Sequence, residues 1–148
     1  MKRDYATYQV ALKVLLRKGR NVLFLRDEKN KWDLPGGRID NVEGRVPLEK
    51  ILAREVREEL GGEVLYDLKL PAVQFRRYID SHHVYNLITV YEAKYRSGDI
   101  ILSHEHVHYE WLNPKTYPFE QKDFCASRKE FYTHEEYKAL MRYFGRVI

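Results

Sequence analysis

The chain has a single cysteine among its 148 residues, and this scarcity excludes two kinds of site. Cys125 has no second thiol with which to close an intramolecular disulfide or to build a zinc site. Because no base is evident beside it, we expect Cys125 to be a buried filler residue rather than a nucleophile. Such low cysteine usage suits a reducing compartment, and we expect a cytoplasmic location.

Long hydrophobic runs are missing as well. The sequence begins Met-Lys-Arg-Asp with no apolar segment behind it, so no secretory signal peptide is expected. No run approaches the roughly 20 apolar residues of a membrane-spanning helix, and no membrane partner is expected. Repeats, low-complexity tracts and linkers are also absent, which predicts a single domain over residues 1–148.

The charge is only weakly basic. Lys and Arg number 26 against 22 Asp and Glu, a net charge of +4, and the isoelectric point is near 9.1. This balance is typical of an ordinary solvated surface and also suits a polyanionic ligand such as a nucleotide. No dense Lys/Arg stripe interleaved with aromatics is visible, so nucleic acid is not expected as a partner.

The hydrophobic pattern and the twelve tyrosines favour a sheet-rich protein with two helices. Helices are predicted over residues 47–60 and 133–144, the second with Thr133 and Glu136 at the spacing of a capping box. The order of elements predicts an α/β (α+β) fold, with helices enclosing a mixed sheet. Strands are predicted over residues 8–16, 22–25, 73–79, 84–95 and 108–112, with turns at 17–21 and 97–99.

The most informative stretch is Arg-Glu-Val-Arg-Glu-Glu-Leu-Gly at residues 54–61. At 100° per residue, Glu55, Glu58 and Glu59 fall within an arc of about 100° on the helix surface. Like charges so placed repel one another by a few tenths of a kcal/mol per pair, which a divalent cation relieves. Alone, such a trio is usually a solvated acidic face. A preceding loop, residues 32–37, ends in Gly36-Gly37, where a backbone carbonyl and a phosphate can both approach a metal.

Residues 34–40 and 54–61 together resemble the Nudix box, whose core is Gly, a spaced Glu, then Arg-Glu-aliphatic-any-Glu-Glu-any-Gly. Glu43 keeps the expected five-residue spacing from Gly37. Ten residues then separate it from Arg54, where the family usually has seven, which indicates a three-residue extension in loop 41–46. We therefore leave Glu43 unassigned. Gly62 also replaces the closing aliphatic residue of the box, a role that Val64 can take over.

The resemblance implies a Nudix-type α/β/α sandwich and a magnesium-dependent pyrophosphohydrolase, with Mn²⁺ as an alternative cation. It implies hydrolysis of a nucleoside diphosphate linked to another moiety, either a nucleoside triphosphate or a dinucleoside polyphosphate. The metal ligands would be the carboxylates of Glu55, Glu58 and Glu59 and the carbonyl of Gly36. Arg54 would orient a helix glutamate.

The general base in this family is either a helix glutamate or an acid from a downstream loop. We choose Glu105 as the downstream acid, because it lies in a polar loop shortly before Trp111. Glu110 is the weaker rival, because it adjoins a predicted strand. His104, His106 and His108 alternate nearby, and we expect surface or substrate-contact roles for them rather than a transition-metal site.

Four residues are predicted to contact substrate: Gly37, Arg38, Trp32 and Tyr78. Trp32 can stack on a base or serve as an apolar anchor for the glycine loop. Tyr78, sixteen residues beyond Gly62, stands where enzymes resembling dinucleoside polyphosphate hydrolases have a Tyr associated with base recognition. Residues 117–131 are expected to form a substrate lid or to pack against the last helix.

Alternative functions remain open at this stage. One is a nucleoside-diphosphate-sugar pyrophosphatase of the ADP-ribose type. Another is a non-catalytic module that senses a nucleotide, although the expected trace, loss of one of the three helix glutamates, is absent. A third is an RNA-binding domain acting on capped ends. The pattern is compatible with either a monomer or a homodimer.

Overall fold

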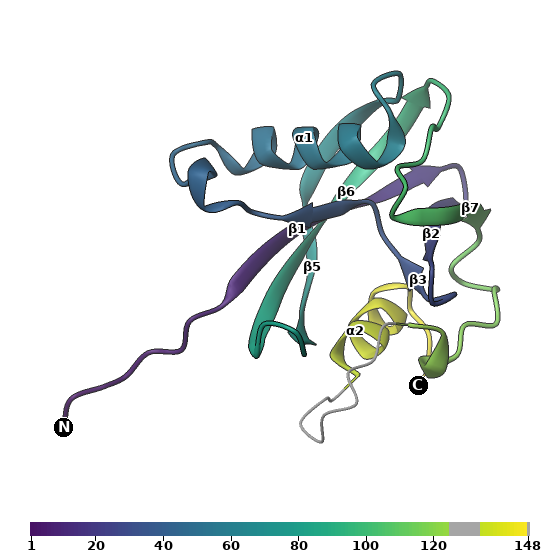
Figure 1. The fold of residues 1–148 in the computed structure, drawn as a ribbon. Helices are drawn as coiled ribbons and strands as arrows, with labels where there is room; N and C mark the ends of the chain where they lie inside the picture. The colour runs from purple at the N-terminus through teal and green to yellow at the C-terminus, as the bar shows by residue number, and fades with distance from the viewer. Residues whose placement is uncertain (125–133, 148) are drawn as a thin grey trace.

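A computed structural model describes residues 1–124 and 134–147, and within them a mixed sheet lies between two helices (Figure 1). Neither described helix is long and apolar enough to cross a membrane. Short 3₁₀ helices lie at Asn41–Glu43 and Gln121–Asp123. The main elements are β1 (Gln9–Lys18), β2 (Asn21–Asp27), β3 (Trp32–Asp33), β4 (Gly36–Arg38), α1 (Leu48–Leu60), β5 (Leu65–Ile79), β6 (Val84–Ser97), β7 (His106–Leu112) and α2 (Glu135–Tyr143).

The seven strands of the described residues form one sheet in the order β3-β2-β1-β6-β5. Strand β4 pairs with the first half of β1, and β7 pairs with β2. The β1–β6 pair is parallel and the other pairs are antiparallel, so the predicted mixed sheet and α+β class are confirmed.

Strand β1 is buried on both faces, and its alternation divides the interior into two clusters. Leu12, Val14 and Leu16 pack with the apolar stripe of α1 on one face. Ala11 and Leu15 pack with residues of α2 on the other. The two helices therefore cover opposite faces of the sheet, as the layers in Figure 1 show.

Strands β1, β2, β5, β6 and β7 all extend beyond their predicted ranges, and β1 and β5 show why. Strand β1 continues to Lys18, and a two-residue turn at Gly19-Arg20 leads directly into β2. The polar end of β1 shows no hydrophobic pattern in the sequence, because backbone pairing with β2 and not side-chain burial holds it in the sheet. Strand β5 begins at Leu65 rather than at residue 73, and register shifts surround Pro71. A proline is tolerated because β5 is an edge strand with a free side.

The start of the last helix also differs from the prediction. Helix α2 begins at Glu135 and is preceded by His134 in the left-handed region, with φ of 56°. Glu136, one half of the predicted capping box, lies in the first turn with a buried side chain that pairs with Arg77. Its proposed partner Thr133 lies outside the described residues, as do Cys125 and the end of segment 117–131.

Strand β4 brings the glycine loop against the middle of β1. Gly36 has φ of 141°, and a Cβ there would lie 2.1 Å from the Leu12 carbonyl oxygen and 2.6 Å from Lys13 Cα. Both obstacles are backbone atoms, so neither can move without disturbing the central strand. Gly36 is therefore required by the fold, whatever its part in the site.

We expect Gly36→Ala to lower the free energy of unfolding by about 2–5 kcal/mol, through backbone strain and the steric clash. Gly62→Ala is the matched control, since a Cβ at Gly62 meets no atom within 4 Å, and it should change stability by less than about 1 kcal/mol. Urea denaturation followed by tryptophan fluorescence compares the two. Equal midpoints would show that β4 does not need a glycine at this position.

Candidate metal and substrate site

A polar cleft of about 480 Å³ lies where α1, β4 and the start of β7 approach the sheet. A larger groove of about 730 Å³, beside Leu68–Ala72 of β5, contains none of the predicted site residues and is mainly apolar. Most of the site residues predicted from the sequence therefore lie in the smaller cleft. Among its lining residues are the predicted Gly36, Gly37, Arg38, Glu55, Glu58, Glu59 and Glu105.

Helix α1 places its glutamates at the cleft because its apolar stripe is held against the sheet. Leu52, Val56 and Leu60 are buried on the side that faces β1. Glu55 and Glu59 lie beside this stripe and are only 9% and 6% exposed, whereas Glu58 points further toward solvent. Two of the three predicted ligands are thus partly removed from water, and their charges need partners.

The glycine loop makes room for one of these carboxylates. A Cβ on Gly37 would lie 2.1 Å from Oε2 of Glu55, so only glycine allows the carboxylate to rest against the backbone. Neighbouring hydrogen bonds, Val14 N to Pro35 O and Ile39 N to Val10 O, fix the β4–β1 register. The alternation of an antiparallel ladder then turns the Gly36 backbone groups away from β1, which leaves its carbonyl available.

Arg54 holds three carboxylates at once. It donates to both oxygens of Glu43 at 2.8 and 2.6 Å, to Glu55 at 2.8 Å and to Glu58 at 3.0 Å. The hydrogen bond from Arg54 lowers the pKa of Glu43, and the same bond raises the pKa of Arg54 above its ordinary value. The longer loop before α1 therefore still delivers Glu43 to Arg54, a contact that the sequence spacing did not lead us to assign.

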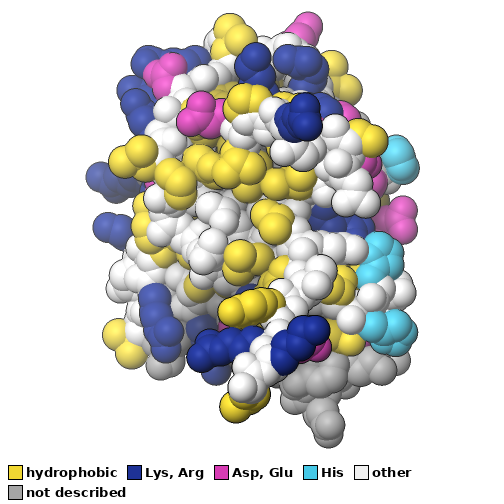
Figure 2. Space-filling model, turned by 90° about the vertical axis from the view of Figure 1, so that its left-hand side faces the viewer, with side chains coloured by type: hydrophobic (Ala, Val, Ile, Leu, Met, Phe, Trp, Pro, Cys, Tyr) yellow, Lys and Arg dark blue, Asp and Glu magenta, His cyan; other side chains and the backbone are white. Residues whose placement is uncertain are grey.

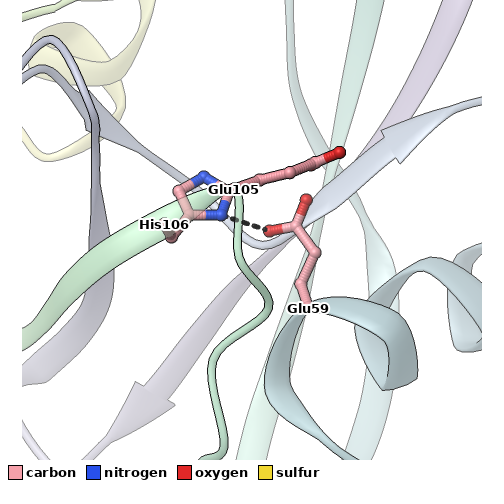
Figure 3. A group of neighbouring side chains, drawn as sticks. All are labelled: Glu59, Glu105 and His106. Atoms are coloured by element: carbon pink, nitrogen blue, oxygen red, sulfur yellow. Dashed lines mark ion pairs between the residues drawn. The ribbon is translucent and has the colours of Figure 1, made fainter.

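Glu59 faces the loop that precedes β7 (Figure 3). Its Oε2 lies 3.4 Å from Nδ1 of His106, and Glu59, Glu105 and His106 offer ligand atoms within 4.8 Å of one another. His106 is 7% exposed, so a surface role for it is wrong. His104 and His108 are exposed, and Glu110 pairs with His108 and does not line the cleft.

A buried charge network continues from His106 across the sheet. Asp33 accepts from Lys13 at 2.9 Å and lies 3.5 Å from Nε2 of His106 and 3.6 Å from Arg77. Arg77 in turn pairs with Glu136 of α2. Burial works to raise the pKa of Asp33, but Lys13, His106 and Arg77 outweigh it and hold that pKa well below its ordinary range.

The pKa values of two helix carboxylates, Glu55 and Glu59, shift in the opposite direction, upward. Burial raises the pKa of Glu59 to about 7, and neither Lys13 nor His106 fully offsets it. Burial also raises the pKa of Glu55, against the opposing effect of Arg54. The positive charge around these two positions is therefore too small to offset the burial of ionised glutamates. Oε2 of Glu59 is buried and has no hydrogen-bond partner among the described residues.

These features fit a hard divalent cation. Carboxylate oxygens and a free backbone carbonyl are the ligands that Mg²⁺ prefers, and a cation would supply the charge that burial withholds. The buried, unpartnered oxygen of Glu59 and the space kept open by Gly37 are the structural observations that support this fit. His106 is a nitrogen donor, and its contacts with Glu59 and Asp33 suit a residue that orients a ligand.

Two predicted substrate contacts lie away from the cleft. Trp32 is 1% exposed, with Arg26 over its ring and aromatic neighbours at its edges, so it is the apolar anchor and not a free stacking surface. Tyr78 packs against Tyr85 and is not among the lining residues. Arg38 does line the cleft, where it donates to Gln9 at 2.8 Å.

Several cleft residues were missed in the sequence. Lys13 carried a signal, since it is the one charge inside the apolar run of residues 10–16. Asp33, Arg77 and Asn86 carried none, because their neighbours are set by strands far apart in sequence. His106 was visible, but only the fold shows that it lies between Glu59 and Asp33.

The NUDIX domain family matches residues 7–134 of the chain. No curated protein matches it in sequence. Among solved structures, a MutT protein from Methanosarcina mazei has a TM-score of 0.72 at 23% identity, over 95% of this chain and 96% of that one. A NUDIX hydrolase from Nitrosomonas europaea has 0.66 at 15% identity, over 94% and 89%. An ADP-ribose pyrophosphatase from Streptococcus suis has 0.54 at 16% identity, over 92% and 91%.

The raised pKa of Glu59 predicts a pH-dependent penalty in the metal-free protein. Its pKa rises from 4.5 to about 7 on folding, so ionisation opposes folding increasingly between these pH values. In EDTA, Glu59→Gln should therefore exceed wild type in free energy of unfolding by about 2–3 kcal/mol above pH 7, with the difference vanishing near pH 4.5. Urea denaturation across this range measures it.

Glu49→Gln is the control, because Glu49 is an exposed glutamate in the first turn of the same helix. It should follow wild type at every pH. Adding Mg²⁺ should stabilise wild type more than Glu59→Gln. A stability difference between Glu59→Gln and wild type that does not change with pH would contradict the assignment of a charge-deficient site.

Proposed function

The chain belongs to the NUDIX family, and we propose that it is a magnesium-dependent hydrolase of a phosphoanhydride bond in a nucleoside diphosphate linked to another moiety. Nucleoside triphosphates and dinucleoside polyphosphates are the favoured substrates. The observation that carries the proposal is the meeting of Glu55, Glu58 and Glu59 with the glycine loop in one polar cleft. A volume of about 480 Å³ is of the size that holds a small-molecule ligand.

Mg²⁺, or Mn²⁺ in its place, would be held by Glu55, Glu58 and Glu59 and by the carbonyl of Gly36. When bound, the cation supplies positive charge for the phosphoryl oxygens and acidifies a water molecule. The chain's own contribution is to hold the carboxylates in place. Arg54 does this for Glu55 and Glu58 through charge-assisted hydrogen bonds, and His106 lies 3.4 Å from Glu59 as its charge partner.

Glu105 is our choice for the general base. It is exposed at the rim of the cleft, and its carboxylate lies within 4.8 Å of ligand atoms of Glu59 and His106. A carboxylate so placed can accept the proton of a water molecule that attacks phosphorus. The rival Glu110 lies outside the cleft, in β7, with His108 as its partner.

The substrate's phosphates would lie beside Gly37 and Arg38, which line the cleft next to the glutamates. A backbone without a Cβ and a guanidinium are both suited to a phosphate group. The fold is shared with an ADP-ribose pyrophosphatase, so a nucleoside-diphosphate sugar is the alternative substrate. A module that binds nucleotides without turnover is less favoured, because all three helix glutamates are present and face the cleft.

The charge distribution on one face of the molecule gives no support to an RNA partner. On the face shown in Figure 2, Lys and Arg side chains stand in separated groups with hydrophobic side chains between them. A continuous basic stripe is the usual electrostatic footprint of a nucleic-acid site. The described part of this face carries no such stripe.

We expect wild type to release a nucleoside monophosphate from at least one member of a panel of nucleoside triphosphates, dinucleoside polyphosphates and ADP-ribose, only when Mg²⁺ or Mn²⁺ is present. Glu58→Gln should lower kcat/KM at least about 100-fold, because it removes a carboxylate on which cation binding depends. Chromatography of the products identifies the bond that is cleaved.

Glu49→Gln is again the matched control, since it makes the same chemical change on α1 outside the cleft. It should keep wild-type activity, which separates the enzyme from contaminating phosphatases. A folded wild-type protein that yields no metal-dependent product across the panel would rule out the proposed function.

Replacement of the proposed base gives a separate prediction. Glu105→Gln should lower kcat about 10²–10⁴-fold across the pH profile. Mg²⁺ binding should change little. Glu110→Gln serves as the control and should retain the wild-type pH profile. Unchanged turnover of Glu105→Gln over a wide pH range would transfer the role to a helix glutamate.

A further inference from the structure

Asn86 of β6 presents a buried polar group to the cleft that no residue satisfies. Its side chain is 5% exposed, and the cleft is lined in part by this residue. The carbonyl oxygen Oδ1 is fully buried and has no hydrogen-bond partner among the described residues. Buried amide oxygens are normally paired, and leaving one unpaired destabilises the fold. An unpaired group in a ligand cleft points to a donor that arrives with the ligand.

Several other polar side chains of the cleft have partners within the protein. Lys13 donates to the Leu34 carbonyl at 3.0 Å and to Asp33 at 2.9 Å. Arg77, which is paired with Asn86 in the β5–β6 register, forms an ion pair with Glu136. Two further buried lining atoms without a hydrogen-bond partner, on Glu59 and His106, lie 3.4 Å from each other at the metal end. Asn86 Oδ1 accepts no hydrogen bond from Lys13 or Arg77.

The sheet topology places Asn86 two strands away from the glycine loop that lies beside the glutamates. Strand β6 lies on one side of β1, and β4 with its two glycines lies on the other. Two strand spacings, about 10 Å, therefore separate Asn86 from the glycine loop across the sheet. A ligand whose phosphates lie at the glutamates would reach Asn86 most directly through a group attached beyond them.

We propose that Asn86 is a specificity-determining residue that binds the nucleobase of the substrate through its side-chain amide. This inference rests on the proposed function, since it assumes a nucleotide whose phosphates lie at the helix glutamates. A neutral amide offers one acceptor and one donor side by side, which matches a base edge that presents an amino or imino N–H beside a ring nitrogen or carbonyl. A phosphate carries no N–H to satisfy Oδ1, so Asn86 does not belong to the phosphate subsite.

Binding of nucleotides that cannot be hydrolysed tests the role of Asn86 independently of turnover. Dissociation constants for α,β-methylene triphosphates of adenosine, guanosine, cytidine and uridine are measured by titration calorimetry with Mg²⁺, alongside tripolyphosphate as a base-free probe. Wild type should prefer one base or one pair of bases. Asn86→Ala should weaken the preferred nucleotide about 10–100-fold, change the least preferred one little, and leave tripolyphosphate unchanged.

Gln74→Ala is the matched control, because it removes an exposed amide from the neighbouring strand β5. It should bind all five probes as wild type does. Asn86→Ser, a smaller change that keeps a polar group, is used if Asn86→Ala does not give a cooperative thermal transition, and it should also reduce the preference among bases.

Three results would overturn the role of Asn86. The first is an unchanged preference among the bases, and the second is an equal loss of affinity for all nucleotides and tripolyphosphate. The third, measured with the 2′-deoxyribose analogue of the preferred nucleotide as an added probe, is a loss confined to discrimination between the two sugars, which would assign Asn86 to the sugar. Hydrolysis by wild type accompanied by any of these would leave the proposed function intact, whereas wild type that neither binds nor cleaves any nucleotide would remove both.

Discussion

Repulsion among carboxylates is the physical constraint on which the structure of this site depends. Glu55, Glu58, Glu59 and Glu105 line one cleft, and two of them are nearly buried by the helix that carries them. Burial raises the pKa of Glu59 to about 7, and the opposing effects of Lys13 and His106 do not fully offset the loss of water. An ionised Glu59 therefore lacks balancing charge, and a divalent cation is the ligand that we propose for this site.

The surrounding structure limits this repulsion without abolishing it. On one side Arg54 binds Glu43, Glu55 and Glu58 with a single guanidinium group. On the other side, contacts run from Glu59 through His106 to Asp33 and onward to Lys13 of the central strand. A planar, always charged guanidinium suits the first task, since its five donors can serve several carboxylates together. The buried histidine suits the second, because its two ring nitrogens face different acids.

The same network ties the cleft to the far helix. Arg77 bridges Asp33 and Glu136, and Glu136 is 3% exposed beneath α2. The position of α2 is thus coupled to the polar floor of the cleft by ion pairs as well as by apolar packing. This pairing engages the carboxylate of Glu136, the half of the predicted capping box that the structure describes. A buried guanidinium binds the carboxylate more strongly than a solvated helix end does.

Much of the site followed from local sequence, because its core is one turn of helix and one loop. The spacing of Glu55, Glu58 and Glu59 determined that they share a face, and Gly36-Gly37 determined where the backbone could approach them. Helical periodicity and glycine conformation act over a few residues, so no fold was needed to infer them. The mixed sheet with helices on both faces followed from the order of elements in the same way.

Only the tertiary structure decided which distant residues complete the cleft. Asp33, Arg77 and Asn86 come from three strands whose neighbours depend on sheet order and register, and a shift of one residue would turn each side chain to the other face. The sequence left open whether Trp32 stacks on a base or anchors the glycine loop. Strand pairing places Trp32 in the core, so it is the anchor. Local sequence determined the glutamates and glycines at one end of the cleft, whereas long-range strand pairing decided which side chains line the other end.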